Sequence, residues 1–176
     1  MASSSYCFSV LSLVVLLPFL LHSASATSYI DAICQKFRGD KAFCVKTLSA
    51  YPPAASATSP LQAAVATLNL GSSYASKTAD FTGKAAKADP KLMKDLAACQ
   101  NEFVVIQRSL KSASSEVKED PESANYDVML CFDSTTSVKN LVGKNTDQAS
   151  KTVITMTLMM EKFIGLGLGA TETLGG

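Results

Sequence analysis

The sequence predicts an all-α protein, an up-down-up-down four-helix bundle preceded by a small N-terminal helical hairpin. Apolar and small residues recur at alternating steps of four and three along four long segments, and this spacing keeps one narrow face of each helix turned toward its partners. Cap and proline signals precede three of these segments, at Ser59-Pro60, Asp89-Pro90 and Asp120-Pro121. Because short links connect antiparallel neighbours, the up-down arrangement is the simplest architecture.

Residues 1–26 are predicted to be a secretory signal peptide. They carry no charged side chain, contain an apolar run from Val10 to Leu21, and end in the small-residue pattern Ala24-Ser25-Ala26. We expect cleavage after Ala26. A membrane anchor is the alternative, but it needs about 20 apolar residues, usually with basic flanks, and this run is shorter.

Residues 27–53 are predicted to form the helical hairpin. Its first arm carries an apolar stripe, Gly39-Asp40 interrupts the pattern, and Pro52-Pro53 ends the second arm. Cys34 and Cys44 lie on the two arms, where a disulfide would close a short, local loop. A zinc site is the alternative, and four unclustered cysteines without histidine argue against it.

Residues 54–170 are predicted to form the bundle, and its seams are rich in Ala, Ser and Thr. Small side chains leave less hydrophobic stabilisation than a leucine-rich core would have. Asn145, with Gln148 three residues later, is expected to open the last helix. The Gly-rich end from Gly165 is expected to contribute little, with residues 171–176 forming a frayed tail. The seam residues are Leu61, Val65, Leu68, Ser72, Ala75 and Ala79; Leu92, Leu96, Cys99, Phe103, Ile106, Leu110, Ala113 and Val117; Ala124, Val128, Cys131, Thr135, Val138 and Val142; and Ala149, Val153, Met156, Met160 and Phe163.

The mature chain is expected to lack histidine, because the only histidine is His22. This removes Ser-His and Cys-His nucleophile pairs, His-ligated haem, Glu-x-x-His di-iron sites and zinc sites that use histidine. A glycosidase could still use two carboxylates, but the acidic residues lie at helix ends and on polar faces, where solvation explains them. The net charge of +1, from 16 basic and 15 acidic residues, gives no broad field for nucleic acid or an anionic membrane. We therefore expect a protein that is not an enzyme and has no cofactor, metal, nucleic-acid or membrane partner.

The order of these features resembles the plant invertase and pectin methylesterase inhibitor family. The features are a cleaved signal, a Cys-x9-Cys hairpin with FCVKTL around the second cysteine, a proline-rich break, and a bundle with a third cysteine in ACQNEF. The resemblance spans about Ser28 to Leu168. It implies a secreted, monomeric, non-catalytic bundle that binds one carbohydrate-active enzyme one to one and covers its active-site cleft, in the apoplast and cell wall or in the vacuole. It also implies disulfides between the first and second and between the third and fourth mature cysteines.

Cys131 departs from the pattern of that family. SANYDVMLCFDS aligns on a segment like SANxxxSAALDD, so that the usual fourth cysteine falls on Val138 and Cys131 stands one heptad early. An antiparallel hairpin that turns near Asp120 pairs residues whose numbers sum to about 240, which places Cys99 opposite the region near Leu141. The offset between Cys99 and Cys131 is then roughly 10 to 15 Å, whereas a disulfide needs Cα atoms within about 7 Å. A mutual disulfide and two buried free thiols therefore both stay open.

The segment Pro121-Glu122-Ser123 bears on the choice of enzyme. Invertase inhibitors of the family often carry Pro-Lys-Phe at the corresponding turn, where the lysine reaches an acidic sugar-binding site. Glu122 reverses that charge and would face catalytic carboxylates, so pectin methylesterase is favoured and acid invertase is the alternative. Arg108 and Lys111 are further candidate contacts with the enzyme, although such polar faces are ordinarily only solvated.

Two other classes of function remain open from the sequence. Met156, Met159, Met160 and Phe163 could line a site for an apolar ligand in the bundle, although residues at helical spacing more often pack a core. The segment from Val153 to Gly169 could be a membrane-active helix, but Glu161 and Lys162 interrupt it and no basic face flanks it.

Overall fold

The computed structural model describes residues 28–176, and the predicted signal peptide lies outside the described residues. Residues 28–176 contain helices joined by short turns and no strand, which confirms the all-α prediction. A helix over residues 28–36 is followed by α2 (Lys41–Ser49), α3 (Pro52–Ala55), α4 (Pro60–Ala88), α5 (Met93–Glu116), α6 (Pro121–Val142) and α7 (Gln148–Glu172).

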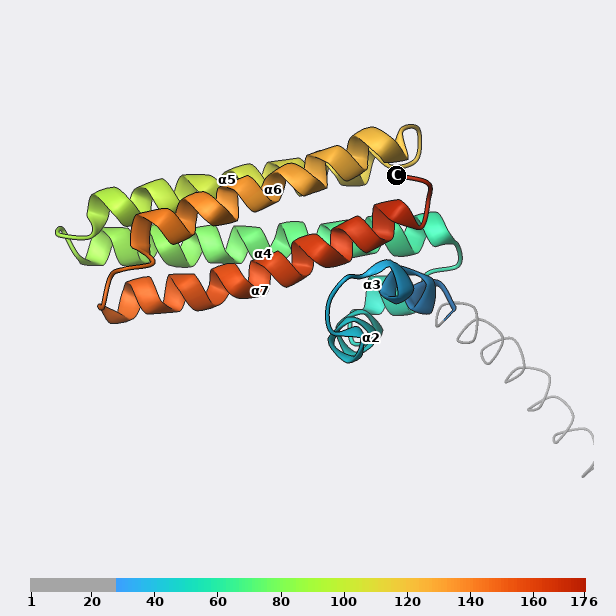
Figure 1. Ribbon diagram of the computed structural model, residues 1–176, viewed down its shortest axis with the longest axis horizontal. Coiled ribbons are helices and arrows are strands. Elements are labelled where there is room, and N and C mark those ends of the chain that lie inside the picture. The colour runs from blue at the N-terminus through green and yellow to red at the C-terminus, as the bar shows by residue number, and fades with distance from the viewer. Residues whose placement is uncertain (1–27) are drawn as a thin grey trace, which may run out of the picture.

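The four long helices pack as a closed antiparallel bundle (Figure 1). α4 contacts α5, α5 contacts α6, α6 contacts α7, and α7 contacts α4 again, so every long helix has two bundle neighbours. Short turns join consecutive helices, as expected for up-down-up-down topology. The helix over residues 28–36 and α2 form a hairpin beside one half of α7, and α2 is seen nearly end-on, so it crosses the bundle axis steeply (Figure 1).

Two of the three predicted cap signals begin helices. The Ser59 hydroxyl accepts the Gln62 N–H at 3.2 Å, and Asp120 accepts the Ser123 N–H at 2.9 Å, each one residue before a proline at the first helical position. Asp89 behaves differently, because it ends α4 and its carboxylate accepts the Lys91 N–H, so that α5 begins only at Met93.

The last helix also starts at a residue other than the expected one. Asp147 rather than Asn145 is its N-cap, and the Asp147 carboxylate accepts the Ser150 N–H at 2.8 Å. The Asn145 amide instead donates to the Ser150 hydroxyl at 3.2 Å. Both side chains therefore secure the first turn of α7, but only the carboxylate caps it.

The buried core has two parts that meet along α7. The larger part fills the bundle with the predicted seam residues, among them Leu68, Phe103 and Val128. The smaller part holds the hairpin against α4 and α7, with Leu48 of α2 and Leu166 of α7 both fully buried. Buried threonines are common in these helices, and every buried side-chain polar atom in the described part of the chain has a hydrogen-bond partner.

The expectation of a frayed Gly-rich end is wrong. α7 continues to Glu172, and Leu166, Gly167 and Ala170 are buried. A Cβ at Gly167 would lie 3.1 Å from Val128 Cγ1, and a Cβ at Gly169 would lie 2.8 Å from the carbonyl oxygen of Ile33. The glycines therefore permit close packing against the bundle on one side and the hairpin on the other, which holds this segment in place.

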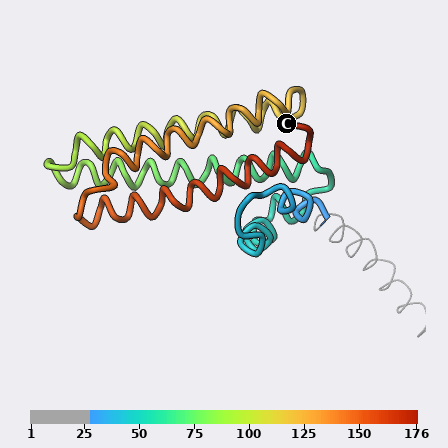
Figure 2. Tube along the Cα trace, viewed as in Figure 1, coloured from blue at the N-terminus to red at the C-terminus, as the bar shows by residue number. Residues whose placement is uncertain are grey.

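Residues 171–176 are likewise ordered against the rest of the chain. Thr171 is fully buried and accepts a hydrogen bond from the Asn125 amide of α6 at 2.7 Å. The Gly176 N–H donates to the Thr171 carbonyl at 3.1 Å, and Gly176 lies against the backbone of Pro121. Figure 2 shows this end of the trace reaching the turn between α5 and α6.

Candidate functional site

The turn between α5 and α6 carries three of the predicted contact residues, Pro121, Glu122 and Ser123. Asp120 organises the turn, because its carboxylate accepts both the Ser123 N–H at 2.9 Å and the Ser123 hydroxyl at 2.7 Å. Both hydrogen bonds lower the pKa of the Asp120 carboxyl, and the one from the Ser123 N–H has the larger effect. Pro121 occupies the first helical position, and the side chains of Glu122 and Ser123 are exposed.

This turn is acidic. Glu116, Glu119, Asp120 and Glu122 lie within residues 116–122, where Lys118 is the one basic residue. Lys118 is already paired with Glu119, with the Lys118 Nζ atom 2.8 Å from Oε1. The exposed tip of the α5–α6 pair therefore presents a net negative charge to a partner.

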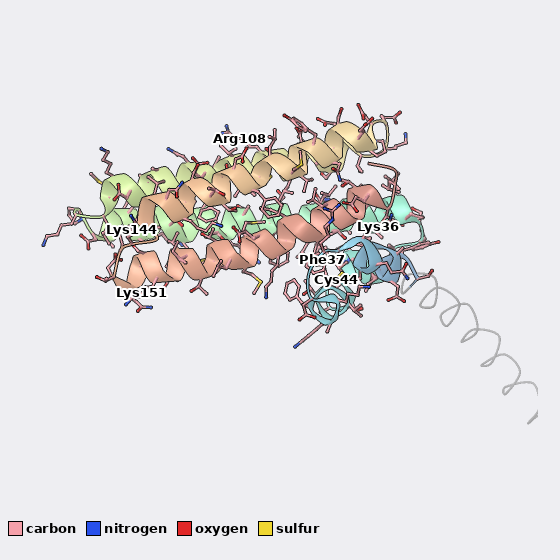
Figure 3. All side chains as sticks on the ribbon, in the orientation of Figure 1. Lys36, Phe37, Cys44, Arg108, Lys144 and Lys151 are labelled. Carbon is pink, nitrogen blue, oxygen red and sulfur yellow. A yellow bond between two sulfur atoms is a disulfide. The ribbon has the colours of Figure 1, made fainter. Side chains whose placement is uncertain are left out.

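Arg108 and Lys111 lie on the same helical pair but away from the tip. Both side chains are exposed on α5, and Figure 3 shows Arg108 on the outer side of the bundle. Lys111 stands six residues and Arg108 nine residues before Val117, so they lie about 9 and 14 Å along the helix axis from the turn. The structure thus places the five predicted contact residues on one pair of helices but not in one cluster.

An exposed apolar face lies on α6, and the seam pattern in the sequence did not predict it. Tyr126, Met129 and Leu130 are 56%, 48% and 40% exposed, and they follow Glu122 on the same face of the helix. We call Tyr126, Met129 and Leu130 the α6 face. The signal in the sequence was that these large apolar residues fall outside the seam that contains Val128. The α6 face is therefore a candidate interaction surface.

The cysteines divide into one bonded pair and two thiols. Cys34 and Cys44 form a disulfide whose Cα atoms are 5.7 Å apart, and it ties the two arms of the hairpin. Cys99 and Cys131 are free and fully or almost fully buried. The Cys131 thiol donates to the Asp127 carbonyl oxygen at 3.5 Å, one turn earlier in the same helix. In this structure Cys99 and Cys131 are therefore two separate buried thiols.

Burial dominates the chemistry of both thiols. Desolvation, reinforced by the charges of Asp95 and Glu102, raises the pKa of Cys99 to about 12. Desolvation also raises the pKa of Cys131 to about 12, with a smaller opposing effect from its bond with Ser109. A reactive cysteine needs an exposed thiolate, so these side chains act as small hydrophobes of the core.

The two alternative functions left open by the sequence, an internal ligand site and a membrane-active helix, both involve α7. Met160 is fully buried in the bundle core, so its side chain packs rather than lines a cavity. α7 is long and apolar enough to cross a membrane by length and composition, and half of its most apolar window is buried inside the bundle, as in the core helix of a globular protein. Within residues 28–176 no group of His, Cys, Asp and Glu side chains is arranged to hold a metal ion.

Comparison with known protein families matches residues 28–130 to the plant invertase/pectin methylesterase inhibitor family. The match covers more than half of the chain and includes the hairpin, α4, α5 and the α6 face up to Leu130. It ends one residue before Cys131, the position at which the chain departs from the resembled cysteine pattern. A search of curated proteins found no match.

Proposed function

Because the chain belongs to the plant invertase/pectin methylesterase inhibitor family, we propose that it is a secreted inhibitor of pectin methylesterase that binds the enzyme one to one over its active-site cleft. The family consists of proteins that inhibit one of these two enzymes rather than catalyse a reaction themselves. The choice of enzyme rests on the charge of one exposed side chain, that of Glu122.

Glu122 stands in the first turn of α6, at the place where invertase inhibitors of the family present a lysine. Its side chain is exposed, and Glu119 and Asp120 lie close to it in the chain. An acidic tip brought against the catalytic carboxylates of an invertase would meet like charges in a site that excludes water, and such juxtaposition costs several kcal/mol in rough terms. This repulsion disfavours invertase, and it is the observation that carries the proposal.

The α6 face supplies the apolar centre of the proposed contact surface. Interfaces typically have an apolar core rich in Tyr and Met and a polar, solvent-accessible rim. Tyr126 and Met129 fit that core, and Arg108, Lys111 and Glu122 fit the rim.

Secretion is proposed from the predicted signal peptide and the hairpin disulfide. The Cys34–Cys44 bond is of a kind that persists in oxidising compartments and is rare in the cytosol. The apoplast and cell wall are the proposed destination, with the vacuole as the alternative.

The surface is tested with the mature chain, a purified plant pectin methylesterase and a purified acid invertase. Tyr126→Glu and Met129→Glu should each weaken inhibition of pectin methylesterase by at least tenfold, because a charge replaces an apolar contact at the centre of the interface. The matched control is Leu158→Glu on α7, which is 51% exposed and lies outside the α6 face. Equal inhibition by the wild type and both α6 variants would contradict the proposed surface.

The target is tested by charge reversal at the tip. The wild type should inhibit pectin methylesterase and leave acid invertase nearly unaffected, whereas Glu122→Lys with Ser123→Phe should create or strengthen invertase inhibition. The cap survives this change, because the backbone N–H of residue 123 still donates to Asp120. Glu119→Lys changes the net charge equally at a neighbouring residue and should not have this effect. Strong invertase inhibition by the wild type, with pectin methylesterase unaffected, would make acid invertase the target.

A further inference from the structure

A groove of about 710 Å³ runs between the hairpin, α6 and α7, and none of the three residues of the α6 face lines it. Its apolar lining comes from Phe37 at the end of the first hairpin arm, Phe132 of α6, and Leu158, Gly165 and Leu168 of α7. This volume is within the range of roughly 300 to 1,000 Å³ that is typical of small-molecule sites.

Two glycines shape one wall of the groove by leaving room for the ring of Phe37. A Cβ at Gly165 would lie 2.8 Å from Cε2 of Phe37, and a Cβ at Gly39 would lie 2.4 Å from its Cζ. No side chain larger than hydrogen fits at either position while the ring stays in place. The hairpin loop and α7 thus meet around Phe37, and the groove exists only because the hairpin is docked on the bundle.

The floor of the groove is one face of α7. Lining residues recur along it from Leu158 to Glu172, a span of fourteen residues, or about 21 Å of helix. Leu158 is 51% exposed and marks one end. An elongated apolar chain therefore suits the groove better than a compact ring system.

The charges around the groove leave a positive excess. The two carboxylates that line the groove are paired within the protein, Glu161 with Lys139 at 2.7 Å and Glu172 with Arg38 at 3.5 Å. Lys36 and Lys162 line the same groove, are exposed, and have no carboxylate within ion-pair distance among the residues that the structure describes. The Lys162 Nζ atom lies 4.9 Å from the centre of the Phe43 ring, a neutral contact that leaves its charge available.

We propose that this groove binds a single-chain amphipathic carboxylate, that is, a long-chain fatty acid. The acyl chain lies along α7 between Phe37 and Phe132, and the carboxylate lies at the rim beside Lys36 and Lys162. The long lysine stems allow their ammonium groups to meet the carboxylate in water at the rim. This site differs from the internal one that the methionines of the last helix suggested, because Met160 is buried in the core and the groove lies on the outside of the bundle.

Titration of the mature protein with a fluorescent long-chain fatty acid, below its micellar concentration, should give saturable binding of one molecule per chain. Leu158→Glu places a negative charge in the path of the acyl chain and should weaken binding at least tenfold. Val105→Glu is the matched control, because Val105 is 49% exposed at mid-helix on α5, outside the groove. Equal binding by the wild type and Leu158→Glu, or no saturable binding, would overturn the proposal.

The role of charge is tested with a fatty alcohol of the same chain length. The wild type should prefer the acid, and Lys36→Ala with Lys162→Ala should reduce that preference at least fivefold. Lys94→Ala with Lys151→Ala removes the same charge from exposed positions outside the groove and should leave the preference unchanged. An unchanged preference in the first double variant would refute the placement of the carboxylate.

A further measurement on the wild type needs no variant. Arg38 is exposed in the hairpin loop and lines the groove, so a bound fatty acid should slow tryptic cleavage after Arg38. Lys144 lies in the exposed α6–α7 turn at the opposite end of the bundle from Phe37 (Figure 3), and cleavage there should proceed at the same rate with or without ligand. The peptides are quantified by mass spectrometry after reduction of the hairpin disulfide. Equal protection at both sites, or none at Arg38, would contradict binding in the groove.

Discussion

The two buried thiols allow a direct chemical test of the bundle register. Burial raises the pKa of Cys99 and of Cys131 to about 12, compared with 9.0 for an exposed thiol. This difference lowers the thiolate population near pH 8 by roughly a thousandfold relative to the unfolded chain. Since only the thiolate attacks a disulfide reagent, both thiols should be almost inert in the folded protein.

The assay uses a chromogenic aromatic disulfide with the mature chain near pH 8. In denaturant, without reductant, two thiols per chain should react quickly, and in native buffer both should react at least a thousandfold more slowly, because steric burial adds to the loss of thiolate. Rapid reaction of either thiol in the native protein would refute its burial. No reactive thiol in denaturant would reveal a Cys99–Cys131 disulfide and would refute the presence of two free thiols.

The same thiols predict how the free energy of unfolding changes in alkali. Their pKa values are higher in the folded state than in the unfolded state, so their contribution to stability is complete below pH 9 and is lost as the pH rises from 9 toward 12. At pH 10 the loss is on the order of 1 kcal/mol for each thiol. Cys99→Ala with Cys131→Ala should remove this part of the alkaline destabilisation, measured by denaturant unfolding. An identical pH dependence in the wild type and the double variant would refute the assignment.

Three further predictions concern the core, a helix cap and the hairpin. Phe103 is fully buried, so Phe103→Ala should lower the free energy of unfolding by about 3 to 5 kcal/mol in denaturant titrations, and a loss well below 1 kcal/mol would contradict its place in the core. Asp120→Ala removes the acceptor for the Ser123 N–H and should lower the melting temperature. Hydrogen bonding lowers the pKa of Asp120 in the folded state, so the difference in melting temperature between the variant and the wild type should shrink as the pH falls below 3.8. A difference in melting temperature that grows in acid would exclude this explanation. Replacing Cys34 and Cys44 by serine opens a loop with a sequence separation of 10 and should lower the free energy of unfolding by roughly 3 kcal/mol. Trypsin should then cleave the hairpin faster than in the wild type. An unchanged cleavage rate would argue against the disulfide as the main restraint on the hairpin.

Periodicity and capping chemistry are local properties, and for that reason the sequence predicted most of the helices. The seam residues of the four long segments are largely the buried ones, and Ser59 and Asp120 cap helices as their neighbours predict. Asp89 shows the limit of this reasoning, since the same Asp-Pro pair that caps α6 terminates α4 instead. A cap signal marks a helix boundary, but the packing of both neighbouring helices decides which side of the boundary it serves.

The proposed contact surface was only partly predictable. The acidic residues of the α5–α6 turn follow directly from the sequence, because a turn between two capped helices is exposed. The α6 face could not be predicted from the sequence, because Tyr126, Met129 and Leu130 are as apolar as core residues. Only the packing of α6 against its neighbours leaves them exposed.

The sequence by itself determined the helical class and the local hairpin with its paired cysteines, whereas it left the pairing of Cys99 with Cys131 open. Each depends on residues near one another in the chain or on the fixed rise of a helix. Only the tertiary structure determined that the Gly-rich end is helical and that the groove exists. Glycine lowers helix propensity in isolation, and Gly169 is helical because the hairpin backbone packs where a side chain would stand. The groove also depends on this docking, since Phe37 and Leu158 are distant in sequence and line one groove only when the hairpin packs on α7.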